Sequence, residues 1–94
     1  MNNTDKKIDK AAREYIIAHT QYALWDCSDA MHEIDELEAV WEALTNNNPK
    51  LKDYIKKNLY DFYKEQVEDI AKENGETLEE VLEDYGNNLL LPYE

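Results

Sequence analysis

The sequence has few of the residues that break helices, form disulfides or bind nucleic acid. Its 94 residues include two glycines, two prolines and one cysteine, and its 22 acidic side chains outnumber ten lysines and arginines. A single cysteine, Cys27, excludes an internal disulfide and a zinc site built from several thiolates. The net charge of −12 argues against direct contact with DNA, RNA or an anionic membrane, because such contacts need clustered Lys and Arg.

Long apolar segments are also missing. No run approaches the roughly 18 residues of a membrane span, and the first seven residues lack the apolar stretch of a signal peptide. We therefore expect a soluble protein of the cytoplasm. The length suits a single domain over residues 1–94. A hydrophobic fraction of 43%, with seven tyrosines, excludes a disordered acidic tail.

Apolar residues recur at helical spacing, and no segment alternates as a strand does. The pattern predicts helices near residues 5–25, 27–45, 49–74 and 78–85. The expected fold class is therefore all-α, a small bundle of three to four helices. A seven-residue series runs unbroken through the first two segments, so one long or kinked N-terminal helix is the alternative to two. We favour two helices, because a single one would span about 60 Å. The series comprises Ile16, Ala23, Ala30, Leu37 and Leu44.

Local signals mark the predicted helix boundaries. Thr4 is the expected N-cap of the first helix, and Pro49, which follows three asparagines, suits a first helical position. Gly75 is expected to end the third helix, because glycine adopts positive φ without a steric clash. Thr77 and Glu80 have the spacing of a capping box and predict the start of the last helix.

Charge is divided unevenly along the chain. Residues 14–48 contain eight acids and no lysine or arginine, and residues 73–94 contain seven acids and again no base. On a helix the acids of the first block fall into two rows, the second beside the first. Like charges one turn apart destabilise a helix by about 0.2–0.5 kcal/mol per pair, so the rows carry a small stability cost. The first row is Asp26, Asp29, Glu33 and Glu36, and the second is Asp35, Glu38 and Glu42.

Carboxylates spaced along a helix can stand in for the phosphates of a nucleic acid and attract basic residues of another protein. The alternative is a solvated face on a protein that is merely acidic. The predicted partner-binding surface comprises Asp26, Asp29, Glu33, Asp35, Glu36, Glu38, Glu42, Glu79, Glu80, Glu83 and Asp84.

Aromatic residues supply a second set of candidates. Trp25, Trp41 and most tyrosines are expected in the core, but seven tyrosines exceed what a small core can hide. Tyr60 and Tyr63 fall off the apolar stripe of their helix, so we predict that they contact a partner or a second copy of the chain. The short apolar tail, residues 87–94, either folds back on the core or offers its leucines and Tyr93 to a partner.

No constellation of residues predicts catalysis, a metal or a cofactor. Asp29 and His32 form one imperfect copy of a metal-binding pair, where a carboxylate-bridged centre needs several. Cys27 and His19 lie on apolar stripes and are expected to be structural. Residues 70–81 resemble a helix-turn-helix, but the would-be recognition helix has four acids and no base, which predicts a packing hairpin.

These features predict a non-enzymatic protein that inhibits or neutralises a basic, nucleic-acid-binding partner protein. In length, acidity and lack of a catalytic motif the chain is similar to small phage and mobile-element inhibitors of host defence, including anti-restriction and anti-CRISPR proteins. That similarity implies a basic protein partner such as a nuclease complex, with no direct contact to nucleic acid or membrane. An antitoxin or immunity protein has the same profile. The other alternative is a helical adaptor or homo-oligomer that pairs through the heptad series and the tail.

Overall fold

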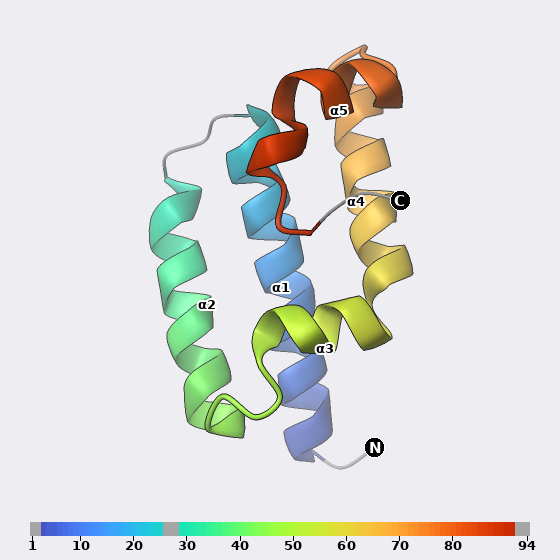
Figure 1. The fold of residues 1–94 in the computed structure, drawn as a ribbon. Coiled ribbons are helices and arrows are strands. Elements are labelled where there is room, and N and C mark those ends of the chain that lie inside the picture. The colour runs from blue at the N-terminus through green and yellow to red at the C-terminus, as the bar shows by residue number, and fades with distance from the viewer. Residues whose placement is uncertain (1–2, 26–28, 92–94) are drawn as a thin grey trace.

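The computed structural model describes residues 3–25 and 29–91, which form an all-helical fold (Figure 1). Five α-helices and one 3-10 turn are present in this part of the chain, against the three to four helices predicted. The elements are α1 (Asn3–Trp25), α2 (Ala30–Thr45), α3 (Leu51–Asn58), α4 (Tyr60–Glu73), α5 (Leu78–Tyr85) and the 3-10 turn η1 (Gly86–Asn88). None of these helices is both long and apolar enough to cross a membrane.

Helix α1 lies at the centre of the molecule, with α2 on one side and α4 on the other (Figure 1). Helix α3 crosses one end of this layer, and α5 covers the other end. The 23 residues of α1 span about 35 Å at 1.5 Å per residue. The longest dimension of the molecule is 39 Å, so α1 runs nearly its whole length.

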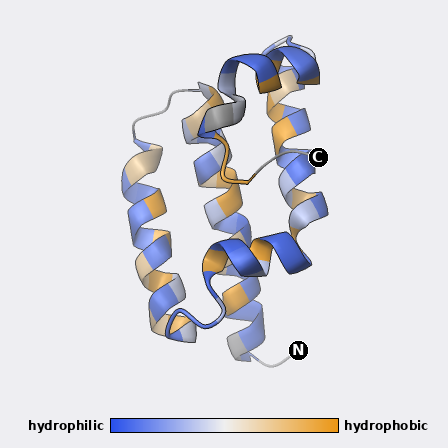
Figure 2. Cartoon of the chain, viewed as in Figure 1, coloured by the Kyte–Doolittle hydropathy of each residue, from blue (hydrophilic) through white to orange (hydrophobic). Residues whose placement is uncertain are grey.

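The core gathers around α1 because this helix buries residues over more than half of its circumference. Four of them are alanines (Ala11, Ala12, Ala18 and Ala23), and their small side chains let α2 and α4 approach closely. Larger buried residues from the neighbouring helices fill the remaining space. Figure 2 shows polar and apolar residues mixed along each helix, as expected where one face of each is buried. The largest fully buried side chains are Trp41, Tyr63, Ile16, Ile55, Val67 and Val81.

The residues of the heptad series pack within the core of the chain itself. Ile16, Ala23, Ala30 and Leu37 are buried, and Leu44 packs against the core. The two-helix prediction is confirmed, since α1 ends at Trp25 and α2 begins at Ala30. The turn predicted around Asp26 and Cys27 lies outside the described residues.

The single helix predicted over residues 49–74 is wrong. Leu59, at φ −128° and ψ 20°, separates α3 from α4. Both helices keep their apolar residues in register with the core, so the sequence period continues across the bend. The bend changes only the direction of the helix axis. As a result α3 crosses the end of the bundle while α4 runs along α1 (Figure 1).

Two predicted helix starts are also wrong. Helix α1 begins at Asn3, so Thr4 lies within its first turn. Helix α3 begins at Leu51, so Pro49 stands before the helix rather than at its first position. Asn46 ends α2 in the left-handed conformation at φ 57°, and the residues between Asn46 and Leu51 form the turn that leads into α3.

The boundaries predicted around α5 are confirmed. Gly75 has φ +73°, the conformation that favours glycine. The Glu80 backbone N–H donates to Thr77 Oγ1 at 3.2 Å, and the Thr77 N–H donates to Glu80 Oε1 at 3.2 Å. This reciprocal pair is a complete capping box.

The segment after α5 folds back on the core. Leu90 and Leu91 are buried. The hydroxyl of Tyr63, on α4, donates to the Leu91 carbonyl at 2.6 Å and accepts from the Leu91 N–H at 3.4 Å. The tail therefore covers α4, as one of the two predicted alternatives requires. Tyr93 lies outside the described residues.

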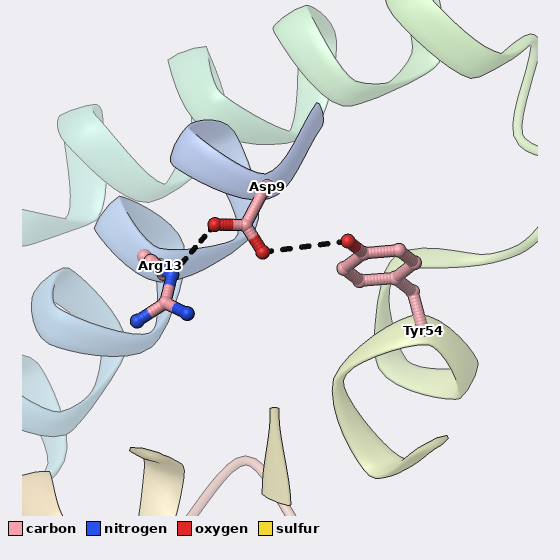
Figure 3. A network of polar contacts seen from close by, with 3 residues as sticks. All are labelled: Asp9, Arg13 and Tyr54. Atoms are coloured by element: carbon pink, nitrogen blue, oxygen red, sulfur yellow. Dashed lines mark hydrogen bonds and ion pairs between the residues drawn. The ribbon is translucent and has the colours of Figure 1, made fainter. Parts of the chain in front are cut away.

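A small polar network joins α1, α3 and α4. Asp9 accepts a hydrogen bond from Arg13 Nε at 2.7 Å and a long one from the Tyr54 hydroxyl at 3.5 Å (Figure 3). The Arg13 guanidinium also lies 4.8 Å from the centre of the Phe62 ring. Asp9 thereby links the start of α1 to α3, and Arg13 links it to α4.

Candidate functional site

The described acids of both predicted rows are exposed. They are Asp29, Glu33 and Glu36 in the first row and Asp35, Glu38 and Glu42 in the second. Asp26 lies outside the described residues. Helix α2 packs mainly against α1, so it forms an edge of the molecule with most of its circumference in solvent (Figure 1). It contains no lysine or arginine.

The sequence predicted that the second row lies beside the first, and this prediction is wrong. Glu33 and Glu42 are nine residues apart, about two and a half turns, and so point from opposite sides of α2. A solvent-facing ridge of His32, Ala39 and Ala43 separates the rows. The first acidic row therefore lies along one side of this ridge, and the second acidic row lies along the other side.

The acids of α5 form a separate exposed group. Glu79, Glu83 and Asp84 are exposed, and so is Glu80. The Glu80 carboxylate is committed to the capping box, where it accepts hydrogen bonds from the Thr77 N–H and hydroxyl. Three of the four α5 acids on the predicted surface thus have no part in that cap.

The fold brings charges that are distant in sequence to opposite ends of the molecule. The start of α2 and the whole of α5 lie at one end, which we call the acidic end: residues 29–36 and 73–84, with ten acids and no base. The start of α1 and α3 lie at the other, which we call the basic end: residues 3–13 and 50–57, with eight bases and three acids. Contacts fix this arrangement, since Trp25 Nε1 donates to Asn74 Oδ1 at 2.7 Å at the acidic end and Asp9 accepts from Tyr54 at the basic end.

The aromatic predictions fail in part. Tyr63 is fully buried, so the prediction that it makes an outward contact is wrong. It lies four residues from the buried Leu59 and Val67, on the core-facing side of α4, and the returning tail also contacts it. Tyr60 is half-buried, with its ring 5.8 Å from that of Tyr63 and 5.5 Å from Lys64 Nζ. Trp41 is buried as expected, whereas Trp25 is 42% exposed and does not belong to the core. Tyr93 lies outside the described residues.

A pocket that the sequence analysis did not foresee lies between α1, α2 and the start of α3. It has a volume of about 390 Å³. Tyr15 lines it from α1, and Glu38 and Glu42 line it from α2. The charged residues that line it from the beginning of α3 are Lys50, Lys52 and Asp53. The Tyr15 hydroxyl donates to Glu38 Oε1 at 2.9 Å. Sequence reasoning placed Tyr15 in the core and Glu38 in an acidic row, and no spacing rule joins residues 23 positions apart.

Burial shifts the pKa values of two α1 side chains in this region, Tyr15 and His19. Burial raises the pKa of the Tyr15 hydroxyl above its ordinary value, and the hydrogen bond to Glu38 raises this pKa further. Tyr15 therefore remains a donor at neutral pH. One turn along α1, burial lowers the pKa of His19, and the nearby Lys52 ammonium adds to the lowering. His19 is half-buried between the rings of Tyr15 and Tyr22, which agrees with the structural role predicted for it.

The remaining motifs gain no chemical function from the fold. In residues 3–25 and 29–91 no three His, Cys, Asp or Glu side chains are grouped closely enough to hold a metal ion. His32 is exposed on the α2 ridge, and Cys27 lies outside the described residues. Helices α4 and α5 form the packing hairpin predicted from the helix-turn-helix spacing, with Ala71 and Val81 buried between them.

The acidic surface must be interpreted from its own geometry. No protein-family model, curated protein sequence or solved structure matches this chain.

Proposed function

We propose that this protein is a non-enzymatic binding protein that occupies a basic, nucleic-acid-binding surface of a partner protein. The observation that carries the proposal is α2, an edge helix with exposed acids on two sides and no basic residue. Most surfaces mix charges of both signs, which reduces repulsion within the fold. A helix that accepts repulsion along both sides is suited to a basic partner that neutralises it.

The acidic end extends this surface. The first turns of α2 and the exposed acids of α5 lie at the same end of the molecule (Figure 1). Ten acids in residues 29–36 and 73–84, beside Lys72 in the last turn of α4, produce a negative potential that speeds encounter with a positive surface. The basic end faces the opposite way, so the charge distribution also orients the protein as it approaches.

The alternative of a homo-oligomer built on the heptad series has less support. That hypothesis needs Ile16, Ala23, Ala30 and Leu37 to pair with another copy, and these side chains are buried within the chain. In the described part of the apolar tail, Leu90 and Leu91 are likewise buried. An inhibitor of a defence complex and an immunity protein for a basic nuclease both remain within the proposed class.

Affinity capture tests the proposal. The tagged protein is incubated with nuclease-treated lysate of its source organism, washed at low salt and eluted with high salt. We expect recovery of a DNA- or RNA-handling protein with a basic surface, and we expect the double variant Glu33→Lys, Glu36→Lys to lose it. Because both positions are exposed, helical circular dichroism should stay unchanged.

The matched control reverses two exposed charges at the other end, Lys56→Glu and Lys57→Glu. This variant should capture the partner at least as well as the wild type. Equal capture by the wild type and the Glu33→Lys, Glu36→Lys variant would overturn the proposal, because binding would then not depend on the acidic surface.

A further inference from the structure

The pocket between α1, α2 and α3 is lined by charged side chains of both signs, with the two glutamates on α2 and both lysines at the start of α3. Glu38 and Glu42 are one helical turn apart on the α2 side, about 6 Å along the axis. Lys50 and Lys52 line the pocket from the start of α3, together with one acid, Asp53, so this segment contributes a net positive charge. Such a site suits a group that carries a cation at its tip and hydrogen-bond acceptors behind it.

The acidic side of the pocket is preorganised. The Tyr15 hydroxyl donates to Glu38 Oε1 at 2.9 Å, and Tyr15 is itself held in the core with 4% of its surface exposed. One oxygen of Glu38 is thereby fixed in position before any ligand arrives. A carboxylate that is already oriented loses less conformational entropy when it pairs with a cation.

The basic side of the pocket offers donors. Lys50 precedes α3 with extended backbone, and no side chain among the described residues caps the first turn of that helix. The two ammonium groups and the first N–H groups of α3 can donate to carbonyl oxygens of a peptide. A peptide backbone on this side places its own side chain toward Glu38 and Glu42.

Size and geometry select among basic side chains. A volume of about 390 Å³ lies near the lower limit for ligand sites, so it admits a side chain rather than a folded segment. A guanidinium has five donors in one plane and can engage two carboxylates together, whereas an ammonium is a point charge. The two carboxylates on one side of the pocket therefore favour arginine over lysine.

We propose that this pocket receives an arginine side chain from a peptide segment of the partner, with the guanidinium paired to Glu38 and Glu42. The identity of the partner rests on the proposed function, but the binding site itself does not. The second acidic row thus acquires a specific ligand, while the first acidic row contributes long-range attraction.

A titration of the protein alone tests this site. N-acetyl-arginine amide is added at low salt to isotope-labelled protein, and the indole N–H resonance of Trp41, which lines the pocket, is followed by NMR. We expect a saturable shift for wild type and about tenfold weaker binding for Glu38→Gln, Glu42→Gln, since charge-assisted hydrogen bonds are lost. The matched control, Glu33→Gln with Glu36→Gln, removes the same charge from the first acidic row and should bind like the wild type.

Two further probes examine the selectivity. N-acetyl-lysine amide should bind several-fold more weakly than the arginine probe, and N-acetyl-citrulline amide, which lacks the charge, should not bind. Equal binding of the arginine and lysine probes would overturn the assignment of a guanidinium site. So would equal weakening by the two glutamine variants, or the lack of any saturable shift at Trp41. Each of these results leaves the capture experiment unaffected, because that experiment depends on the first acidic row and on a partner protein.

Discussion

The two ends of the molecule use charge in opposite ways. At the basic end, Asp9 and Arg13 form an ion pair at 2.7 Å that also contacts Tyr54 and Phe62, so charge helps to join three helices. At the acidic end the carboxylates are mostly exposed, and the capping box of Glu80 is a local contact within one turn. Charge that contributes little to the fold, and that repels its neighbours, is the charge most available for a partner.

The packing of the two ends differs as well. At the basic end Trp41 is buried, donates from Nε1 to the Pro49 carbonyl at 3.0 Å and lies 5.1 Å from the Tyr54 ring. At the acidic end the indole of Trp25 is 42% exposed, and its hydrogen bond to Asn74 lies at the surface. The basic end is therefore expected to be the more stable of the two.

The largest expected effect comes from Trp41→Ala. Removing a buried tryptophan should lower the free energy of unfolding by about 3–5 kcal/mol, because a cavity forms where α2 meets the start of α3. The matched change at the other end, Trp25→Ala, should cost much less, since that side chain is 42% exposed. Urea unfolding of both variants measures the difference. Similar losses would show that the two ends are equally well packed.

A smaller effect is expected where the tail ties the acidic end to α4. In Tyr63→Phe the backbone N–H and carbonyl of Leu91 lose their partner in a buried setting, at a cost of about 1–3 kcal/mol. Hydrogen exchange should show faster exchange at Leu90 and Leu91 and little change at Asp9. Unchanged exchange at the tail would contradict the role given to the Tyr63 hydroxyl.

The same chemical change should have opposite signs at the two ends. Asp9→Asn removes an ion pair and should destabilise the protein by up to about 1 kcal/mol. Glu36→Gln removes repulsion with Glu33 and should stabilise it by a few tenths, on the order of 0.3 kcal/mol. Thermal unfolding at low salt measures both, and added salt should shrink both effects. If both variants changed the stability in the same direction, charge would not act differently at the two ends.

The last prediction concerns the middle of α1, between the two ends. The pKa of His19 is lowered in the folded protein, so the unfolded chain binds its proton more readily. The stability contributed by neutral His19 is present above its ordinary pKa, near 6.5, and is lost as the pH falls below it. Urea midpoints should therefore fall more between about pH 7.5 and pH 5.5 in wild type than in His19→Gln. Parallel pH profiles would exclude His19 as the source of that dependence.

Much of the fold follows from the sequence. Apolar spacing identified many of the residues that the helices bury, such as Ile16 and Leu37, but not Ala18 or Leu24. The glycine and capping-box signals placed the start of α5. The bend at Leu59 escaped prediction because α3 and α4 keep one apolar period through it, and period does not encode direction. Tyr63 escaped although it lies four residues from the buried Leu59 and Val67, because the prediction followed an apolar stripe through Phe62 instead.

The sequence alone determined the helical class, the strong excess of acids and their division into blocks without a base, because these depend on composition and on short-range spacing. Only the tertiary structure decided where the blocks lie. It gathered residues 29–36 with 73–84 at one end and residues 3–13 with 50–57 at the other, through long-range contacts such as Trp25 with Asn74 and Asp9 with Tyr54. It also brought Tyr15 to Glu38 and formed the pocket beside them, since the packing of α1 against α2 fixes which side chains meet.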